Sequence, residues 1–148
     1  MKQQIDIAIR INASPAMVWN TLIDPDLMKQ WMGEPEMYLE IITDWKPGSP
    51  IVIKGFHHVN FVNTGTVLGF EPEKILRYNY LSSISRLPDK PENHTIVEFR
   101  LTPERDQTLL TLNLSNFPTE SIFKHVDFYW RNTMGIIKDS IEREGKTN

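Results

Sequence analysis

Apolar and polar residues alternate at the start of the chain. Isoleucine occupies every second position between residues 5 and 11, which predicts a β-strand over residues 5–12 with one face in water. At Ser14-Pro15 the pattern changes to that of a helix, with an N-cap residue followed by proline at the first helical position. Asp24-Pro25 repeats this signal. We therefore expect two short helices after the first strand, the second ending at Gly33-Glu34-Pro35.

Between residues 37 and 117, apolar runs of strand length are separated by turn residues, without a helical period. We predict strands at 37–45, 51–57, 60–70, 74–83, 94–102 and 107–116. Short connections favour antiparallel pairing of consecutive strands. Three strands carry alternate apolar residues that share a face, namely Leu76, Tyr78 and Tyr80; Val97, Phe99 and Leu101; and Leu110, Leu112 and Leu114. The sheet therefore has one apolar face that needs a cover.

The last segment is predicted to supply that cover. Thr119 is a suitable N-cap, and Glu120 follows in the first turn. Apolar residues then recur at helical spacing: Phe123, Val126, Trp130, Met134, Ile137 and Ile141. Charged residues are expected on the opposite face: Lys138, Asp139, Glu142 and Arg143. The order of elements predicts an α+β fold, in which a curved antiparallel β-sheet wraps around a long C-terminal α-helix.

Length and composition narrow the functional classes. The 148 residues suit one domain, and we predict a single domain over residues 1–148. A net charge of −3 without a basic run argues against nucleic-acid binding. The absence of cysteine excludes disulfides and thiolate chemistry. We find no signal peptide and no segment long enough to insert into a membrane, so we expect a cytoplasmic protein.

Few residues suggest catalysis or metal binding. His57 and His58 are adjacent on a predicted strand, so they point to opposite faces and are poorly placed to share a metal. His94 and His125 are predicted to be exposed, and Asp127 is interpreted as a helix-surface residue. No serine has an identifiable partner base. We therefore predict no metal site, no cofactor and no catalytic residue.

Several short segments, in this order and spacing, resemble those of a known family. They are Ser14-Pro15-Ala16-Met17-Val18-Trp19 with Asp24-Pro25 and Trp31; Thr43-Asp44-Trp45-Lys46-Pro47-Gly48-Ser49-Pro50; Gly65-Thr66-Val67, Glu71-Pro72 and Leu76-Arg77-Tyr78; Thr108-Leu109-Leu110-Thr111-Leu112; and Trp130, Met134 and Ile137. The chain resembles the START-like (SRPBCC) superfamily, and within it the branch similar to the C-terminal domain of the activator of the ninety-kilodalton heat-shock protein ATPase.

The resemblance implies a helix-grip fold with an apolar cavity between the sheet and the last helix. Large side chains on the predicted inner surfaces are the candidate ligand-binding residues: Trp31, Trp45, Phe56, Tyr78, Tyr80, Phe99, Leu112, Phe117, Phe123, Trp130 and Met134. The alternative for this set is ordinary close packing without a ligand. The polar tract 86–93 is either a solvated loop or a border of the cavity mouth.

Three functions remain open at this stage. The first, which we favour, is binding or carriage of a small hydrophobic or amphipathic molecule, lipids included. The second is a cyclase- or aromatase-like enzyme that uses Tyr78 or Tyr80, with Asp127 or His57, on a bound carbonyl compound. The third is a cochaperone-type interaction module, which is disfavoured because no chaperone-binding domain precedes this one. The sequence allows either a monomer or a homodimer through exposed sheet edges.

Overall fold

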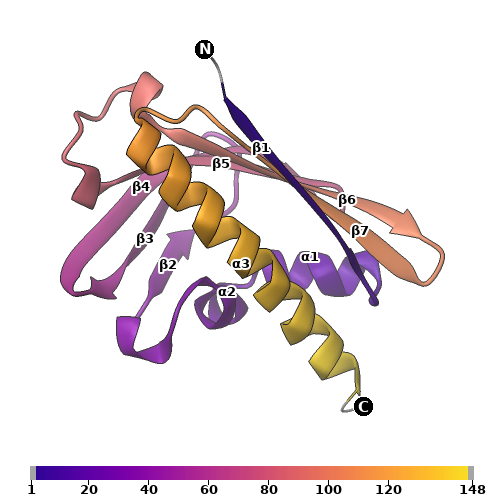
Figure 1. The fold of residues 1–148 in the computed structure, drawn as a ribbon. Helices are drawn as coiled ribbons and strands as arrows, with labels where there is room; N and C mark the ends of the chain where they lie inside the picture. Colours follow the sequence, from indigo (N-terminus) through magenta and orange to yellow (C-terminus); the bar gives the residue numbers. More distant parts are fainter. Residues whose placement is uncertain (1–2, 147–148) are drawn as a thin grey trace.

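The protein folds as an antiparallel sheet that holds three helices against one face (Figure 1). The structure is a computed structural model and describes residues 3–146. Its helices and strands are, in chain order, β1 (Gln4–Ile11), α1 (Pro15–Ile23), α2 (Pro25–Met32), β2 (Glu40–Thr43), β3 (Pro50–His57), β4 (Val59–Glu71), β5 (Ile75–Ser82), β6 (Thr95–Glu104), β7 (Gln107–Ser115) and α3 (Glu120–Lys146). The predicted α+β fold class and its order of elements are confirmed.

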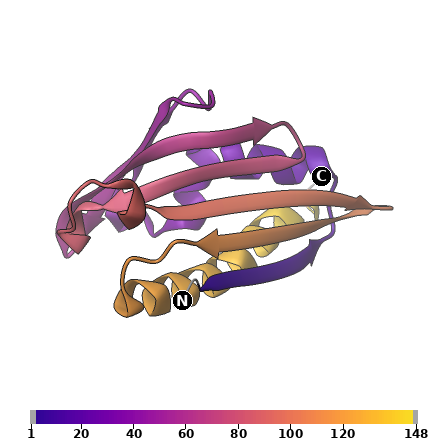
Figure 2. The same cartoon turned by 90° about the horizontal axis from the view of Figure 1, so that it is seen from above.

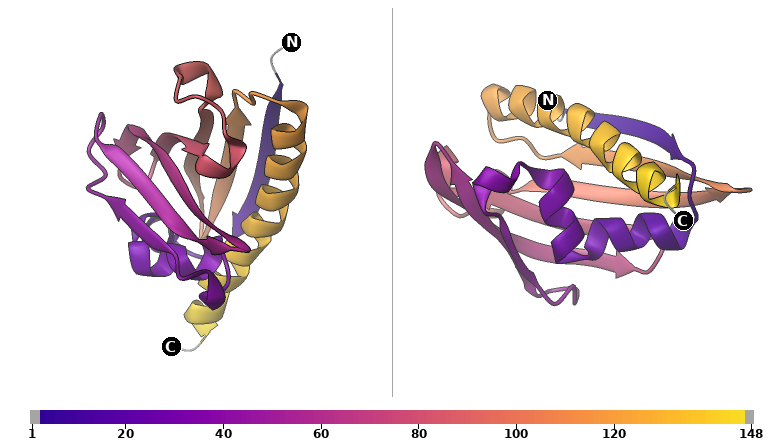
Figure 3. Two further views of the ribbon diagram at one scale, coloured as in Figure 1. Left: turned by 90° about the vertical axis from the view of Figure 1, so that its left-hand side faces the viewer. Right: turned by 90° about the horizontal axis from the view of Figure 1, so that it is seen from below.

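The seven strands lie in the order β1-β7-β6-β5-β4-β3-β2. Consecutive strands from β2 to β7 pair antiparallel, as their short connections require. The first strand instead pairs with β7, the last strand, so β1 forms one edge of the sheet and β2 the other. The register shifts between Val67 and Gly69 on β4. Such irregularities increase local twist, and Figure 3 shows the sheet curving around the helices.

Local capping explains the two short helices. The Ser14 hydroxyl accepts a hydrogen bond from the Met17 amide at 3.3 Å, as an N-cap residue does. Asp24 ends α1 and begins α2, because its backbone N–H donates to the Asn20 carbonyl while its carboxylate accepts from the Asp26 amide at 2.9 Å. This double role of Asp24 sets the turn between the two helices.

The long helix α3 crosses the inner face of the sheet beside α1 and α2 (Figures 2 and 3). Its predicted N-cap is confirmed, since the Thr119 hydroxyl accepts from the Ile122 amide at 3.1 Å. The predicted apolar stripe is also confirmed: Val126, Trp130, Met134, Ile137 and Ile141 are buried, and Phe123 is half-buried. No helix of the described segment is long and apolar enough to cross a membrane.

Two charged residues of α3 differ from their predicted position on its far face. Lys138 donates to the Arg10 carbonyl at 2.8 Å, and Glu142 accepts from the Asn12 amide at 2.8 Å. The two side chains also pair with each other at 2.6 Å. Both side chains are partly buried, because they reach backbone groups at the end of β1 that need a hydrogen-bond partner. This ion pair therefore fastens α3 to β1.

The strand predicted over residues 37–45 is shorter than expected. Only Glu40–Thr43 is extended, and Pro35–Met37 forms a single turn of 3-10 helix. Tyr38 and Trp45 have positive φ angles of 48° and 59°, which remove them from the strand on either side. The segment thereby turns Trp45 inward toward the end of α1.

Candidate functional site

The space between the sheet and the helices is filled mainly by large apolar side chains. Trp130 on α3 packs edge-on against Phe99 of β6, with ring centroids 5.6 Å apart, and lies 6.1 Å from Trp31 of α2. Leu112 and Met134 are buried in the same core. Phe117 and Phe123 are half-buried at the start of α3 and meet edge-on at 5.0 Å. The structure thus brings most of the predicted set together.

Trp31 and Trp45 form hydrogen bonds to backbone carbonyls at the C-terminal end of α1. The Trp31 indole N–H donates to the Thr21 carbonyl at 2.8 Å, and the Trp45 indole N–H donates to the Ile23 carbonyl at 2.8 Å. Carbonyls in the last turn of a helix have no partner within the helix. Both indoles therefore have a structural role that occupies their single donor.

Tyr129 acts in the same way at the end of α2. Its hydroxyl donates to the Met32 carbonyl at 2.7 Å and so joins α3 to α2. Burial raises the pKa of Tyr129 to about 12, an effect that a hydrogen bond with the Thr133 hydroxyl partly offsets. Tyr129 is a neutral phenol at physiological pH. The sequence analysis did not select it, although its spacing from Val126 and Thr133 places it on the buried side of the helix.

Tyr78 and Tyr80 differ from these side chains because their hydroxyls have no hydrogen-bond partner among the described residues. Both lie on the inner face of β5, where Tyr78 is 2% exposed and Tyr80 is half-buried. Burial raises the pKa of each phenol well above its usual range, and Tyr129 adds to both shifts. Tyr78 and Tyr80 are alternate residues on one face of β5, and Tyr80 and Tyr129 both pack against the core that contains Tyr78. We call Tyr78, Tyr80 and Tyr129 the phenol cluster.

Asn63 on β4 adds an unpartnered acceptor close to the phenol cluster. It lies on the same face of β4 as the buried residues Phe61 and Val67, opposite Ser82 of β5. Tyr80 is two residues before Ser82 and so occupies the same inner face. The side-chain oxygen of Asn63 is buried and has no partner within residues 3–144. Sequence reasoning missed this residue, because one asparagine in a strand gives no distinct signal.

Phe56 does not join the interior, contrary to the prediction. It lies on the other face of β3 from the buried Ile51 and Ile53, because side chains alternate along a strand, and it is 46% exposed. There it borders a surface hollow of about 520 Å³ together with Tyr38 and Val62. A second hollow, of about 330 Å³, lies on the outer face of β1, β6 and β7. Neither of these two hollows lies between the sheet and α3.

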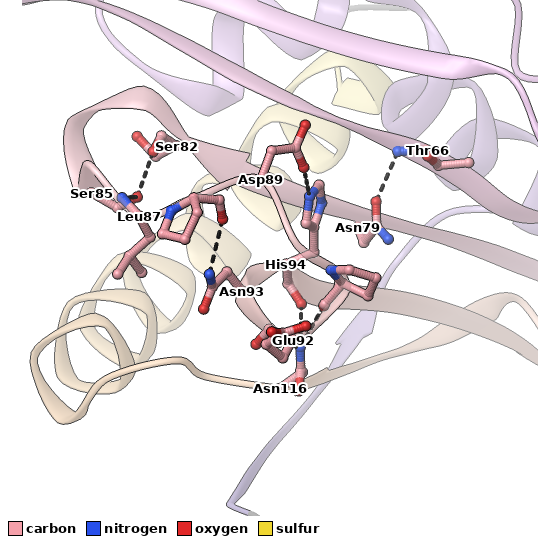
Figure 4. Close-up of polar contacts among 12 residues, drawn as sticks. Thr66, Asn79, Ser82, Ser85, Leu87, Asp89, Glu92, Asn93, His94 and Asn116 are labelled. Atoms are coloured by element: carbon pink, nitrogen blue, oxygen red, sulfur yellow. Dashed lines mark hydrogen bonds and ion pairs between the residues drawn. The ribbon is translucent and has the colours of Figure 1, made fainter.

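The polar loop between β5 and β6 is tied down by side-chain hydrogen bonds (Figure 4). The Asn116 amide donates to the carbonyls of Pro91, Glu92 and His94, the last at 2.6 Å. His94 itself is only 12% exposed, so its predicted exposure is wrong. Its Nε2 is hydrogen-bonded to the Asp89 carboxylate at 2.6 Å. The loop is therefore an ordered part of the surface beside the end of β5.

The remaining titratable candidates lie outside the interior. His57 and His58 are exposed at the turn between β3 and β4, where His58 has a φ of 67°. His125 is exposed, as predicted. Asp127 pairs with Arg131 at 2.8 Å along the surface of α3. No group of three or more potential metal-ligating side chains occurs within the described segment.

An antiparallel sheet curved around a long C-terminal helix, with two short helices after the first strand, is the arrangement of a START-like helix-grip domain. The chain belongs to the family described as activator of Hsp90 ATPase homolog 1-like protein, whose sequence model matches residues 12–142. The predicted family resemblance is confirmed. No curated protein matches the chain.

Several solved structures share the fold. A protein from Cytophaga hutchinsonii, solved in solution, is 30% identical, with a TM-score of 0.81 over 99% of this chain and 98% of that one. The Aha1 dimer from Colwellia psychrerythraea is 22% identical, with a TM-score of 0.74 over 95% of this chain and 96% of that one. CalU16 from Micromonospora echinospora is 24% identical, with a TM-score of 0.72 over 95% of this chain and 74% of that one.

Proposed function

We propose that the protein binds a small hydrophobic or amphipathic molecule between β5, α2 and α3, with the phenol cluster holding its polar group. The observation that carries this proposal is the Tyr78 hydroxyl, which belongs to a residue that is 2% exposed and has no hydrogen-bond partner among the described residues. A fully buried hydroxyl without a hydrogen bond costs about 1–3 kcal/mol, and this is the upper limit for Tyr78 because its oxygen keeps a little accessible surface. A ligand that supplies the missing hydrogen bond removes this cost.

The contrast with neighbouring aromatic residues supports the proposal. The polar atoms of Trp31, Trp45 and Tyr129 complete the ends of helices. The hydroxyls of Tyr78 and Tyr80 form no hydrogen bond to a helix end among the described residues. Both residues lie on β5, a central strand of the sheet. A few convergent polar groups in an otherwise apolar interior are typical of small-molecule sites.

The two hollows described above lie elsewhere, so we expect a ligand to widen the interior as it binds. Three buried methionines lie on the adjoining helices: Met28 and Met32 on α2, and Met134 on α3. Methionine is flexible and changes its packing at low cost. We expect a ligand to enter by displacing Met32 and the Tyr129 hydroxyl that contacts its carbonyl.

Titration with a hydrophobic fluorescent dye, followed by displacement with candidate ligands, tests the proposal. We expect saturable binding with one site per chain, weakened about tenfold in Tyr78→Phe through loss of one hydrogen bond. Tyr38→Phe is the matched control, because Tyr38 is 82% exposed. Absence of saturable binding, or equal binding by all three proteins, would contradict the proposed site.

A cyclase-like reaction is the second candidate. Neutral phenols are able to donate hydrogen bonds to a bound carbonyl, but this candidate also needs a base. Asp127 is paired with Arg131 on the helix surface, and His57 is exposed at a turn. The geometry therefore favours binding over a reaction. The cochaperone role suggested by the family name is tested separately, by adding the protein to a purified chaperone and measuring ATP hydrolysis.

A further inference from the structure

The interior between the sheet and the helices, which we call the inner wall, has few buried polar residues and no buried charged group within the described segment. The buried polar residues of the described segment are four threonines: Thr21, Thr95, Thr108 and Thr133. No lysine, arginine, histidine, aspartate or glutamate within that segment is buried. A carboxylate or an ammonium group moved into this interior would lose its hydration without gaining an opposite charge, which is strongly unfavourable. The wall therefore favours an uncharged ligand.

The wall offers hydrogen-bond donors and an acceptor side by side. The hydroxyls of Tyr78 and Tyr80, on the inner face of β5, have no hydrogen-bond partner among the described residues, and the Asn63 side-chain oxygen is a buried acceptor without a partner there. The register places Asn63 opposite Ser82, so Tyr80 is its diagonal neighbour on the same face. Diagonal neighbours in a sheet lie about 7–8 Å apart at their Cα atoms. Both side chains therefore face the same space above the sheet.

We infer that the ligand belongs to the class of uncharged apolar molecules that carry an alcohol or phenol hydroxyl. That hydroxyl would accept a hydrogen bond from Tyr80 and donate one to the Asn63 oxygen. A hydroxyl fits because it both donates and accepts, whereas an ether or a ketone leaves Asn63 without a donor. The inference rests on the proposed function and extends it by naming the ligand class.

Three naphthalene probes of similar size test the inference by intrinsic fluorescence at pH 7. They are 2-naphthol, which donates and accepts; 2-methoxynaphthalene, which only accepts; and 2-naphthoate, which is anionic. We expect 2-naphthol to bind about tenfold more tightly than 2-methoxynaphthalene, the factor for one lost hydrogen bond. We expect 2-naphthoate to bind most weakly of the three.

The variant Asn63→Leu identifies the acceptor. It should lower the affinity for 2-naphthol to that for 2-methoxynaphthalene and leave the latter unchanged. Asn132→Leu is the control, because Asn132 is exposed on α3. The comparison of probes on the unaltered protein remains decisive even where Asn63→Leu fails to fold.

The outcomes separate this inference from the proposed function. Equal binding of all three probes at one site that Tyr78→Phe weakens would support the proposed function and overturn the ligand class. Preferential binding of 2-naphthoate would also overturn the class. Binding of none of the probes would overturn both. A preference for 2-naphthol that Asn63→Leu abolishes would establish the inference.

Discussion

Replacement of Tyr78 by phenylalanine should stabilise the protein without a ligand. The substitution removes one hydroxyl and keeps the ring, so it creates no large cavity. That hydroxyl has no partner within the described segment and belongs to a residue that is 2% exposed, and a fully buried group of this kind costs about 1–3 kcal/mol. Because the oxygen keeps a little accessible surface, we expect the free energy of unfolding to rise by about 1 kcal/mol, at the lower end of that range.

Urea unfolding followed by tryptophan fluorescence measures this change, after extraction of any bound molecule. The melting temperature should rise by about 2–4 °C per kcal/mol for a chain of this length. Tyr38→Phe, at an exposed position, should leave stability unchanged. If Tyr78→Phe lowered the free energy of unfolding by about 1 kcal/mol or more, the hydroxyl would have a hydrogen-bond partner in the native protein, and the reasoning would be refuted.

Three further predictions concern the framework of the site. Trp31→Phe leaves the Thr21 carbonyl unpaired and should destabilise the protein by about 1–3 kcal/mol in urea, whereas an unchanged midpoint would contradict the capping role. Asn116→Ala removes three loop contacts at a residue with a φ of 62° and should cost about 1–3 kcal/mol, while Asn116→Gly loses the same contacts but tolerates the positive φ and should therefore cost less, and equal costs would contradict the strain at this position. Because burial raises the pKa of Tyr129 to about 12, the unfolded chain loses that proton first as pH rises. The stabilising contribution of Tyr129 should therefore be fully present below pH 10 and be lost between about pH 10 and 12. The free energy of unfolding should fall less steeply with pH in Tyr129→Phe, and an equal slope in both proteins would count against burial of the phenol.

The periodic parts of the fold could be predicted from the sequence. Alternation predicted the inner faces of β5, β6 and β7, and helical spacing predicted the buried stripe of α3 from Val126 to Ile141. Proline after Ser14 and Asp24 predicted both short helices. These signals are local, so they are readable without knowledge of the partner elements.

The tertiary roles of individual side chains could not be predicted in this way. Phe56 comes two residues after the apolar run 51–53, and only the phase of β3 set by Ile51 and Ile53 shows that it faces outward. Lys138 and Glu142 form an (i, i+4) pair typical of an exposed helix face, yet they bind backbone groups of β1. Such roles depend on which elements meet in space.

The candidate site illustrates the same limit. The sequence selected Tyr78 and Tyr80 because they share a strand face, and the structure adds Tyr129 and Asn63 from other elements. Burial alone does not distinguish Tyr78 from Trp31, since both are 2% exposed. The hydrogen bonds distinguish them, because the Trp31 donor is occupied and the Tyr78 hydroxyl has no partner in the described part of the chain.

The most direct test of the central claim is the location of a bound molecule by NMR. Addition of 2-naphthol to isotopically labelled protein should shift the amide signals of residues 78–82 on β5 and of residues 126–134 on α3. These segments carry the phenol cluster. Shifts confined to residues 37–40 and 54–62, which border the surface hollow beside Phe56, would contradict an interior site.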